Sequence, residues 1–289
     1  MKYFLTMKSS IDGTNLERLM IERAIKSHSG EAELLDITSH LKYDDDNTLH
    51  DYLRNLTKNG KVYLMPEVAT ERMADKDYFH KMDPLSPSFI PGGMSILAQV
   101  YAILGHQPTR YDNLIAAFAE GHIKALRATG ATGQEVKEIA LRNRLAEGGS
   151  FSDERHAAFT LGLFKPLKET DTELIYEFGF PNQIFARHTR TSIMDYLLMT
   201  AEKKTITVAF TARDDSGANG VFNDIVRDAS IYSTDEVVIN RIRDELASRG
   251  YDCKAVQYDH QRSLYSFFAL ATKDAKYVAA LGIFLTNEA

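Results

Sequence analysis

The first thirty residues pass from an apolar run through a polar loop into an amphipathic segment. Residues 2–7 are mainly apolar, residues 8–14 are mainly polar, and apolar residues recur close to the helical period over residues 16–25. This pattern predicts a strand, a short loop and a helix with one buried face. Asp12 or Thr14 is expected to cap that helix. Free backbone N–H groups and the helix dipole meet at such strand-to-helix loops in α/β proteins, so we expect a functional site at this edge.

Short strands and helices continue to alternate after the first helix. The pattern predicts a second strand over residues 31–37, a helix over 49–56 and a third strand over 61–65. Strands that are joined by helices in this order indicate a parallel sheet with right-handed crossovers. Residues 1–66 are therefore interpreted as half of a doubly wound domain.

A proline-rich stretch interrupts this pattern, and a helical region follows it. Residues 67–91 are predicted to form a loop with one helical turn around residues 73–78, because prolines break regular elements. Apolar periodicity then returns over the middle third of the chain, which is predicted to be a helical insertion over the sheet. Its helices are expected over residues 94–104, 109–128, 133–147 and 153–164.

The last part of the chain mixes strands and helices again. A lone strand is predicted over residues 172–178, and a helix over residues 191–203 is expected to connect two domains. Residues 259–263 have the composition of a hairpin turn. The later elements are expected to be a strand over 205–210, helices over 221–228 and 235–249, hairpin strands over 253–258 and 264–271, and an apolar element over 275–285.

These elements predict an α/β fold with an N-terminal parallel-sheet domain, a helical insertion and a smaller C-terminal α/β domain. The predicted boundaries are 1–190 for the first domain, 191–204 for the connecting helix and 205–289 for the second domain. A chain of 289 residues is long enough for two domains with separate cores.

Composition and charge narrow the classes of function. The net charge of −6 argues against a general attraction to nucleic acid. No apolar run approaches the roughly 18 to 20 residues that cross a bilayer, and the apolar N-terminal segment is too short for a signal peptide. We therefore predict a cytoplasmic protein with no membrane partner. Cys253 is the single cysteine, which excludes an internal disulfide bond and a cysteine-rich zinc site.

Two segments with small residues precede predicted helices and are the predicted ligand-binding positions. One lies between the first strand and the first helix, and the other opens the apolar helix that follows the proline-rich stretch. Backbone N–H groups at helix starts bind phosphates, although glycine is also common there for structural reasons. The residues expected to bind phosphate or another ligand are Ser9, Ser10, Asp12, Gly13, Gly92 and Gly93.

The proline-rich stretch is the richest in potential metal ligands. Asp75, Asp77, His80 and Asp83 lie close together in the sequence, and carboxylate and imidazole groups bind divalent metals. A solvated loop is the competing interpretation, because no histidines have the spacing that places two ligands on one helix face. No metal cofactor is expected on the first interpretation of the chain. The alternative is a manganese or magnesium site drawn from Asp12, Glu67, Asp77, His80 and Asp83.

The order of the predicted elements is similar to that of the DHH phosphoesterases, a family named for an Asp-His-His motif. Residues 3–13 resemble the family's opening strand and Asp-x-Asp-Gly loop, and residues 92–97 resemble the start of its first connecting helix. Residues 253–259 and 268–274 resemble its C-terminal hairpin. The resemblance covers most of the chain. It implies a parallel N-terminal domain and a C-terminal α/β domain, with manganese or similar ions held between them.

The catalytic signature of that family is largely missing. Asp12 remains from the first metal motif, whereas Lys8 and Ser10 stand at its histidine and aspartate positions. Glu67 lies where the family has its second metal aspartate, Ala271 replaces the hairpin arginine, and the sequence contains no Asp-His-His. Hydrolysis by two metal ions needs several carboxylate and imidazole ligands around ions about 3.5 to 4 Å apart. One aspartate does not provide them.

Three functions follow as hypotheses. In the first, a DHH-like protein has lost metal-dependent hydrolysis and binds a nucleotide, a nucleic-acid end or a protein partner. In the second, the chain is an active metal-dependent phosphoester hydrolase, or a nucleotide or sugar-phosphate transferase, with rearranged ligands. In the third, it is a non-catalytic assembly protein, for which a homo-oligomer is one form.

Overall fold

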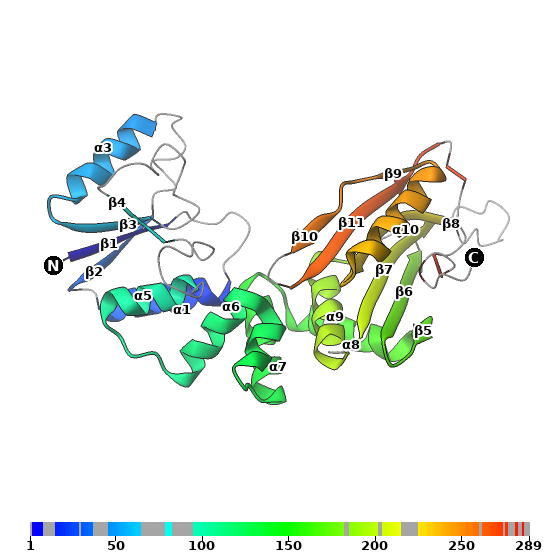
Figure 1. Cartoon of the computed structure of the whole chain (residues 1–289), viewed down its shortest axis with the longest axis horizontal. Helices are drawn as coiled ribbons and strands as arrows, with labels where there is room; N and C mark the ends of the chain where they lie inside the picture. The colour runs from blue at the N-terminus through cyan, green and yellow to red at the C-terminus, as the bar shows by residue number, and fades with distance from the viewer. Residues whose placement is uncertain are drawn as a thin grey trace. The chain divides into compact units, whose positions relative to one another are not determined.

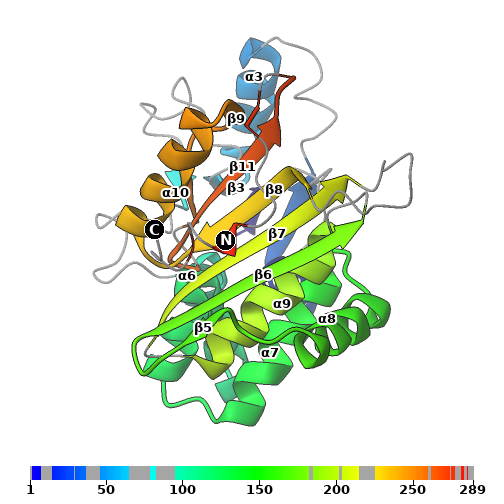
Figure 2. The same ribbon diagram turned by 90° about the vertical axis from the view of Figure 1, so that its right-hand side faces the viewer.

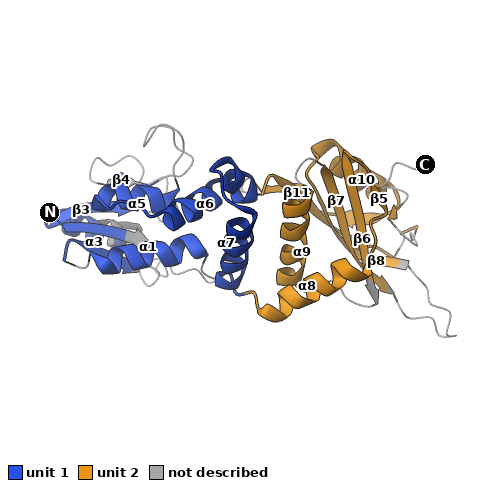
Figure 3. Cartoon of the chain, turned by 90° about the horizontal axis from the view of Figure 1, so that it is seen from below, with its two compact units in different colours: residues 1–148 blue, residues 149–289 orange. Residues whose placement is uncertain are grey.

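The computed structural model describes residues 2–7, 15–28, 30–36, 46–64, 79–82, 95–181, 185–201, 204–214, 225–259, 262–273, 275–276, 281–282 and 285. The chain divides into two compact units, Met1–Gly148 and Gly149–Ala289, each with its own sheet (Figure 3). The first sheet is parallel and the second is mixed. The structure thus confirms the predicted α/β fold class.

The two units divide earlier in the chain than the predicted boundary near residue 190. The division falls between Gly148 and Gly149. Helix α9 (Arg187–Thr200) covers most of the segment that was predicted to connect two domains. Its side chains Ile193 and Leu197 lie in a hydrophobic core of the second unit. The apolar period of this segment predicts the helix, but it does not show what the apolar side packs against.

A four-stranded parallel sheet forms the centre of the first unit. Its strands are β1 (Lys2–Met7), β2 (Ala32–Asp36), β3 (Gly60–Leu64) and β4 (Phe79–Lys81), in the order β2-β1-β3-β4. β1 pairs in parallel with β2 and β3, and β3 pairs in parallel with β4. The first three strands and their parallel pairing confirm the prediction for this part of the chain.

Strand β4 corrects the prediction of a loop over residues 67–91. Its three residues pair with β3, from Val62 with Phe79 to Leu64 with Lys81. So short a strand shows no alternation of apolar and polar residues that a sequence pattern could detect, and its pairing with β3 alone defines it. The helical turn predicted around residues 73–78 lies outside the described residues.

The described helices of the first unit pack against its sheet or against one another. They are α1 (Leu16–Ser27), α3 (Asp46–Leu56), α5 (Ile96–Leu104), α6 (Arg110–Ala128) and α7 (Gly133–Ala146), and they confirm the predicted helices with small shifts at their ends. Leu49 and Leu53 of α3 share a hydrophobic core with Phe4 of β1. α1 and α5 lie on the side of the sheet opposite to α3 (Figure 1). None of the described helices in the chain is both long and apolar enough to cross a bilayer.

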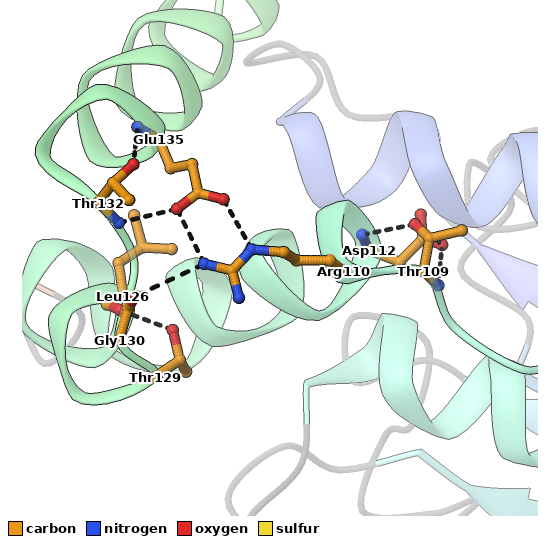
Figure 4. Close-up of polar contacts among 8 residues, drawn as sticks. All are labelled: Thr109, Arg110, Asp112, Leu126, Thr129, Gly130, Thr132 and Glu135. Atoms are coloured by element: carbon orange, nitrogen blue, oxygen red, sulfur yellow. Dashed lines mark hydrogen bonds and ion pairs between the residues drawn. The ribbon is translucent and has the colours of Figure 1, made fainter.

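One ion pair joins the starts of α6 and α7. The Nε and Nη2 atoms of Arg110 donate to the two carboxylate oxygens of Glu135 at 2.8 and 2.9 Å (Figure 4). Glu135 also accepts a 2.8 Å hydrogen bond from the backbone N–H of Thr132, within the capping box that begins α7. Thr109 and Asp112 form the same kind of box at the start of α6. These bonds, above all those from Arg110, lower the pKa of the Glu135 carboxyl from its ordinary 4.5 to about 2.

The second unit contains a mixed sheet in the order β10-β11-β8-β7-β6-β5, with β9 beside β11. Among its described strands, β6 and β7 form the parallel pair, and the other pairs are antiparallel. Its strands are β5 (Lys168–Glu169), β6 (Glu173–Pro181), β7 (Thr205–Asp214), β8 (Ile225–Ser233), β9 (Tyr251–Cys253), β10 (Gln257–Asp259) and β11 (Leu264–Ala271). The strand predicted to stand alone over residues 172–178 is β6, which lies between β5 and β7.

Strand β8 corrects the second half of the helix predicted over residues 221–228, whereas residues 221–224 lie outside the described residues. Its residues pair with β7 on one side and with β11 on the other, so β8 lies inside the sheet. Apolar residues at Val221, Phe222, Ile225 and Val226 fit a helical period. Cross-strand pairing overrides this local preference, because β-structure depends on neighbours that are distant in the sequence.

Separate hydrophobic cores lie on the two faces of this sheet (Figure 2). On one face, α8 (Phe151–Leu163) and α9 pack against β6 and β7, and Phe178 and Phe210 are fully buried there. On the other face, Ile239, Ile242 and Leu246 of α10 (Glu236–Ser248) are fully buried. α8 and α10 confirm the helices predicted in these regions.

The predicted C-terminal hairpin is present with a shorter first strand. β10 pairs antiparallel with β11, with Tyr258 opposite Tyr265. The start of the predicted first strand belongs instead to β9, which pairs with the far end of β11. Most of the apolar element predicted over residues 275–285 lies outside the described residues, although Leu281 and Leu285 are buried in the core beneath α10.

We predict that Gly60→Ala destabilises the first unit. A Cβ on Gly60 would overlap the backbone carbonyl of Lys2, its partner in β1. The two strands would have to separate at this point, which should lower the free energy of unfolding by about 2 to 4 kcal/mol. Urea unfolding followed by circular dichroism measures the change. Gly133→Ala is the matched control, because nothing lies within 4 Å of its added Cβ. An equal effect of both substitutions would contradict the close approach.

We also predict that Glu135→Gln destabilises the first unit in a pH-dependent way. The folded state holds the pKa of Glu135 at about 2, below its ordinary 4.5. The stability due to its charge is therefore complete above pH 4.5 and is lost as the pH falls toward 2. The gap in unfolding free energy between parent and variant should close over that range in urea titrations. Glu138→Gln, which removes an exposed ion pair with Arg142, should cost less at pH 7.

Candidate functional site

The carboxyl edge of the parallel sheet in the first unit is the candidate site. β1, β3 and β4 all end at this edge because they run in parallel. The chain adds β2 on one side of β1 and then β3 on the other side, so the gap between β1 and β3 is a topological switch point. In open α/β sheets, ligands bind outside the carboxyl ends of the strands at such a switch point.

The first turns of α1 and α5 lie beside each other. Glu17 of α1 accepts a 3.0 Å hydrogen bond from the backbone N–H of Leu97 in α5, and its carboxylate also bonds the side chain of Ser95. Glu120 of α6 accepts a 2.7 Å hydrogen bond from the backbone N–H of Ser95. Two carboxylates from different helices therefore accept hydrogen bonds from the first backbone N–H groups of α5. Both interact favourably with the partial positive charge of that helix terminus.

A side-chain amide of α7 accepts a hydrogen bond at the start of α1 in a similar way. The Oδ1 atom of Asn143 accepts a 3.1 Å hydrogen bond from the backbone N–H of Leu16. The Nδ2 atom of Asn143 donates to Glu147 at 2.9 Å, which fixes the orientation of the amide. Asn15 caps the same helix by accepting from the N–H of Arg18, so the prediction of Asp12 or Thr14 as the cap was wrong. Side chains from the three helices α1, α6 and α7, together with the N-cap residue Asn15, thus accept hydrogen bonds from backbone N–H groups at this edge.

The protonation of Glu17 responds to its burial and to the neighbouring carboxylate of Glu120. Burial raises the pKa of the Glu17 carboxyl above its ordinary 4.5, and the charge of Glu120 raises it further. The hydrogen bonds from Leu97 and Ser95 act in the opposite direction but are weaker than the effect of burial. Perturbed carboxyl groups of this kind concentrate at functional sites, although buried structural networks also contain them.

A distortion of α6 follows directly after Glu120. His122 has a φ of 53° and a ψ of −140°, a conformation that costs a residue other than glycine about 1 to 3 kcal/mol. Its ring is buried against Phe118, with the ring centroids 4.2 Å apart. The distortion divides α6 into two segments at the point where Glu120 reaches the start of α5.

The residues that sequence analysis assigned to ligand binding lie outside the described residues, namely Ser9, Ser10, Asp12, Gly13, Gly92 and Gly93. In the sequence, one group immediately precedes α1 and the other immediately precedes α5. Of the proposed metal ligands, Asp12, Glu67, Asp77 and Asp83 also lie outside the described residues.

His80 is the one proposed metal ligand that the structure describes. It lies in β4 opposite Tyr63 of β3, and the two rings stack with centroids 4.9 Å apart. Burial, together with the nearby charge of Lys61, lowers the pKa of the imidazole. The described part of the chain contains no group of three or more histidine, cysteine, aspartate or glutamate side chains that could hold a metal ion.

Glu17, Glu120 and Asn143 were not among the residues predicted from the sequence. An acidic residue in the first turn of a helix is expected to favour the dipole of its own helix, and Glu17 has that position in α1. Nothing local in the sequence indicates that its carboxylate serves α5 instead. The contact joins residues 80 positions apart, and only the folded chain brings them together.

No protein-family model matches the sequence, and the search of curated proteins finds no match.

We predict that Glu17 makes the stability of the first unit fall as the pH rises above 4.5. Its raised pKa means that the folded state retains a proton that the unfolded state has released, so that folding weakens with increasing pH. Glu17→Gln should therefore gain stability relative to the parent chain between pH 4.5 and 8. Urea unfolding at intervals across this range measures the difference. If the unfolding free energies of parent and variant changed with pH in parallel, burial would not raise the pKa of Glu17.

Proposed function

We propose that the chain is a DHH-like protein that binds a nucleotide or a nucleic-acid end at the carboxyl edge of the parallel sheet in the first unit, without hydrolysing it. The contact between the first turns of α1 and α5 is the observation that carries the proposal. The two segments with small residues that were assigned to ligand binding directly precede these helices. Both segments would thus contact the same bound group.

The sheet order supports the position of this site. The switch point between β1 and β3 is where a doubly wound sheet leaves room for a ligand. Phosphate is the proposed contact group, because backbone N–H groups in small-residue segments that lead into helices bind anions. The carboxylates of Glu17 and Glu120 already occupy amides of the α5 start. The ligand would therefore contact the segments before the helices rather than the first turns themselves.

The loss of hydrolysis is proposed from the sequence. Ser10 and Lys8 replace two ligands of the family's first metal motif. The alternative is an active hydrolase or transferase with metal ligands drawn from Asp12, Glu67, Asp77, His80 and Asp83, of which the structure describes His80. The stacking of His80 on Tyr63 shows how the ring is held in the folded chain.

We predict that AMP and a 5′-phosphorylated trinucleotide raise the melting temperature of the full chain in the absence of added metal. A ligand at 100 times its Kd stabilises the folded state by about 2.7 kcal/mol. Lys8→Glu should remove most of this shift, because a negative charge before α1 repels phosphate. Lys58→Glu is the matched control. Lys58 is exposed and lies just before β3, at the amino edge of the sheet. Equal shifts in all three chains would contradict the proposed site.

Metal analysis of the purified chain separates the proposal from the hydrolase alternative. On our proposal, manganese is below one equivalent, and incubation of the oligonucleotide with manganese releases no product. Stoichiometric manganese that is lost in Asp12→Asn, together with cleavage of the oligonucleotide, would replace the proposal with the alternative.

A further inference from the structure

Two histidine side chains meet at the C-terminal ends of α1 and α5. His28 is the C-cap residue of α1, and His106 directly follows Gly105, the C-cap residue of α5. The ring centroids are 5.6 Å apart, and the ring planes are nearly perpendicular, at 84°. Because the first turns of the two helices are also in contact, through Glu17 and Leu97, the helices run side by side in one direction (Figure 1). The histidine pair therefore lies one helix length, about 18 Å, from the start of the 12-residue helix α1.

The hydrogen bonds of His28 determine which of its ring nitrogens can bind a metal ion. Nδ1 lies 2.9 Å from the backbone carbonyl oxygen of Ala24, which can only accept a hydrogen bond. Nδ1 therefore carries a proton, and Nε2 of the neutral ring has a lone pair. Oγ of Ser27 lies 3.1 Å from Nδ1 but donates its own proton to Ala24, so it is consistent with this tautomer. Histidines that bind metals commonly donate their other N–H to a carbonyl oxygen, which fixes the ring orientation.

The pair is open to solvent and lies where a positive charge is favoured. His106 is exposed and His28 is partly exposed, so an ion reaches both rings at the surface without a cavity. The ring of His106 lies against the buried ring of Tyr101, with the centroids 4.8 Å apart. The last carbonyl groups of α1 and α5 give both helix ends a partial negative charge, which attracts a cation. Lys26 is the basic residue in the last turn of α1, and the last turn of α5 has none.

We propose that His28 and His106 together bind a zinc ion, with water molecules completing its coordination. Two imidazoles that hold zinc at about 2.0 to 2.1 Å in a tetrahedral arrangement have ring centroids roughly 5 to 5.5 Å apart. The observed separation of 5.6 Å is close to this value. The exposed ring of His106 can rotate to complete the alignment, since exposed side chains change rotamer within nanoseconds. The ion would hold the ends of α1 and α5 together, and the site does not depend on the function proposed above.

Zinc titration of the full chain against a coloured chelator measures the number of bound equivalents and their affinity. His28→Gln and His106→Gln should each weaken one zinc equivalent by at least about 10- to 100-fold, because loss of an outer-shell partner alone has an effect of that size. His156→Gln is the matched control, since it removes an exposed imidazole from α8 in the second unit, and it should leave this equivalent unchanged. Magnesium should not compete, because it prefers oxygen ligands.

The double variant of His28→Gln and His106→Gln distinguishes one shared site from two separate ones. Either single substitution already breaks a shared site, so the double variant should lose no further zinc. If His28→Gln fails to fold by circular dichroism, His28→Asn carries the test, because asparagine is accepted at helix ends. The proposal is overturned if the pair and His156→Gln behave alike, if only one histidine of the pair matters, or if the two losses add. The AMP-induced shift in melting temperature should persist in these variants, so a failure of the nucleotide proposal is seen separately.

Discussion

Parallel pairing of β1 with both of its neighbours is the constraint on which the first unit depends. Strands that run in one direction end at one edge, and the helices that follow them must begin there. α1 and α5 accordingly begin side by side, and their free N–H groups and positive termini need acceptors. Glu17, Glu120 and Asn143 supply these acceptors from three helices.

Placing two carboxylates at this edge costs free energy, which nearby hydrogen bonds offset. Glu17 and Glu120 repel each other, and burial disfavours the charge on Glu17. The hydrogen bonds from the start of α5 act against both effects. The strained backbone at His122 lies directly after Glu120, and its ring is packed against Phe118. Strain of this size persists only where surrounding contacts hold it, so the packing around α6 helps to position one carboxylate of the edge.

The second unit meets a different constraint, because its sheet is covered on both faces. Alternating residues of β7 and β8 enter two cores, and a single extra residue at Arg227 changes which face receives a charged side chain. The sequence contains Arg227-Asp228 as an ordinary pair of charges. Only the register with Ala212 and Arg213 shows that Arg227 is an extra residue in β8, next to Asp228. The arrangement of these two charges is thus set by strand registration.

The sequence by itself determined the fold class, the three first strands, most helices and the closing hairpin, because these depend on periods and caps within about ten residues. For example, Thr132 and Glu135 form a capping box, a local pattern that indicates the start of α7. Only the tertiary structure shows that residues 79–81 and 225–233 form the strands β4 and β8, and where the two units divide. It also shows that Glu17 of α1 accepts a hydrogen bond from the start of α5. Each of these depends on partners far away in the chain, and a local pattern carries no information about which distant segment will supply the other half of a hydrogen bond or a core.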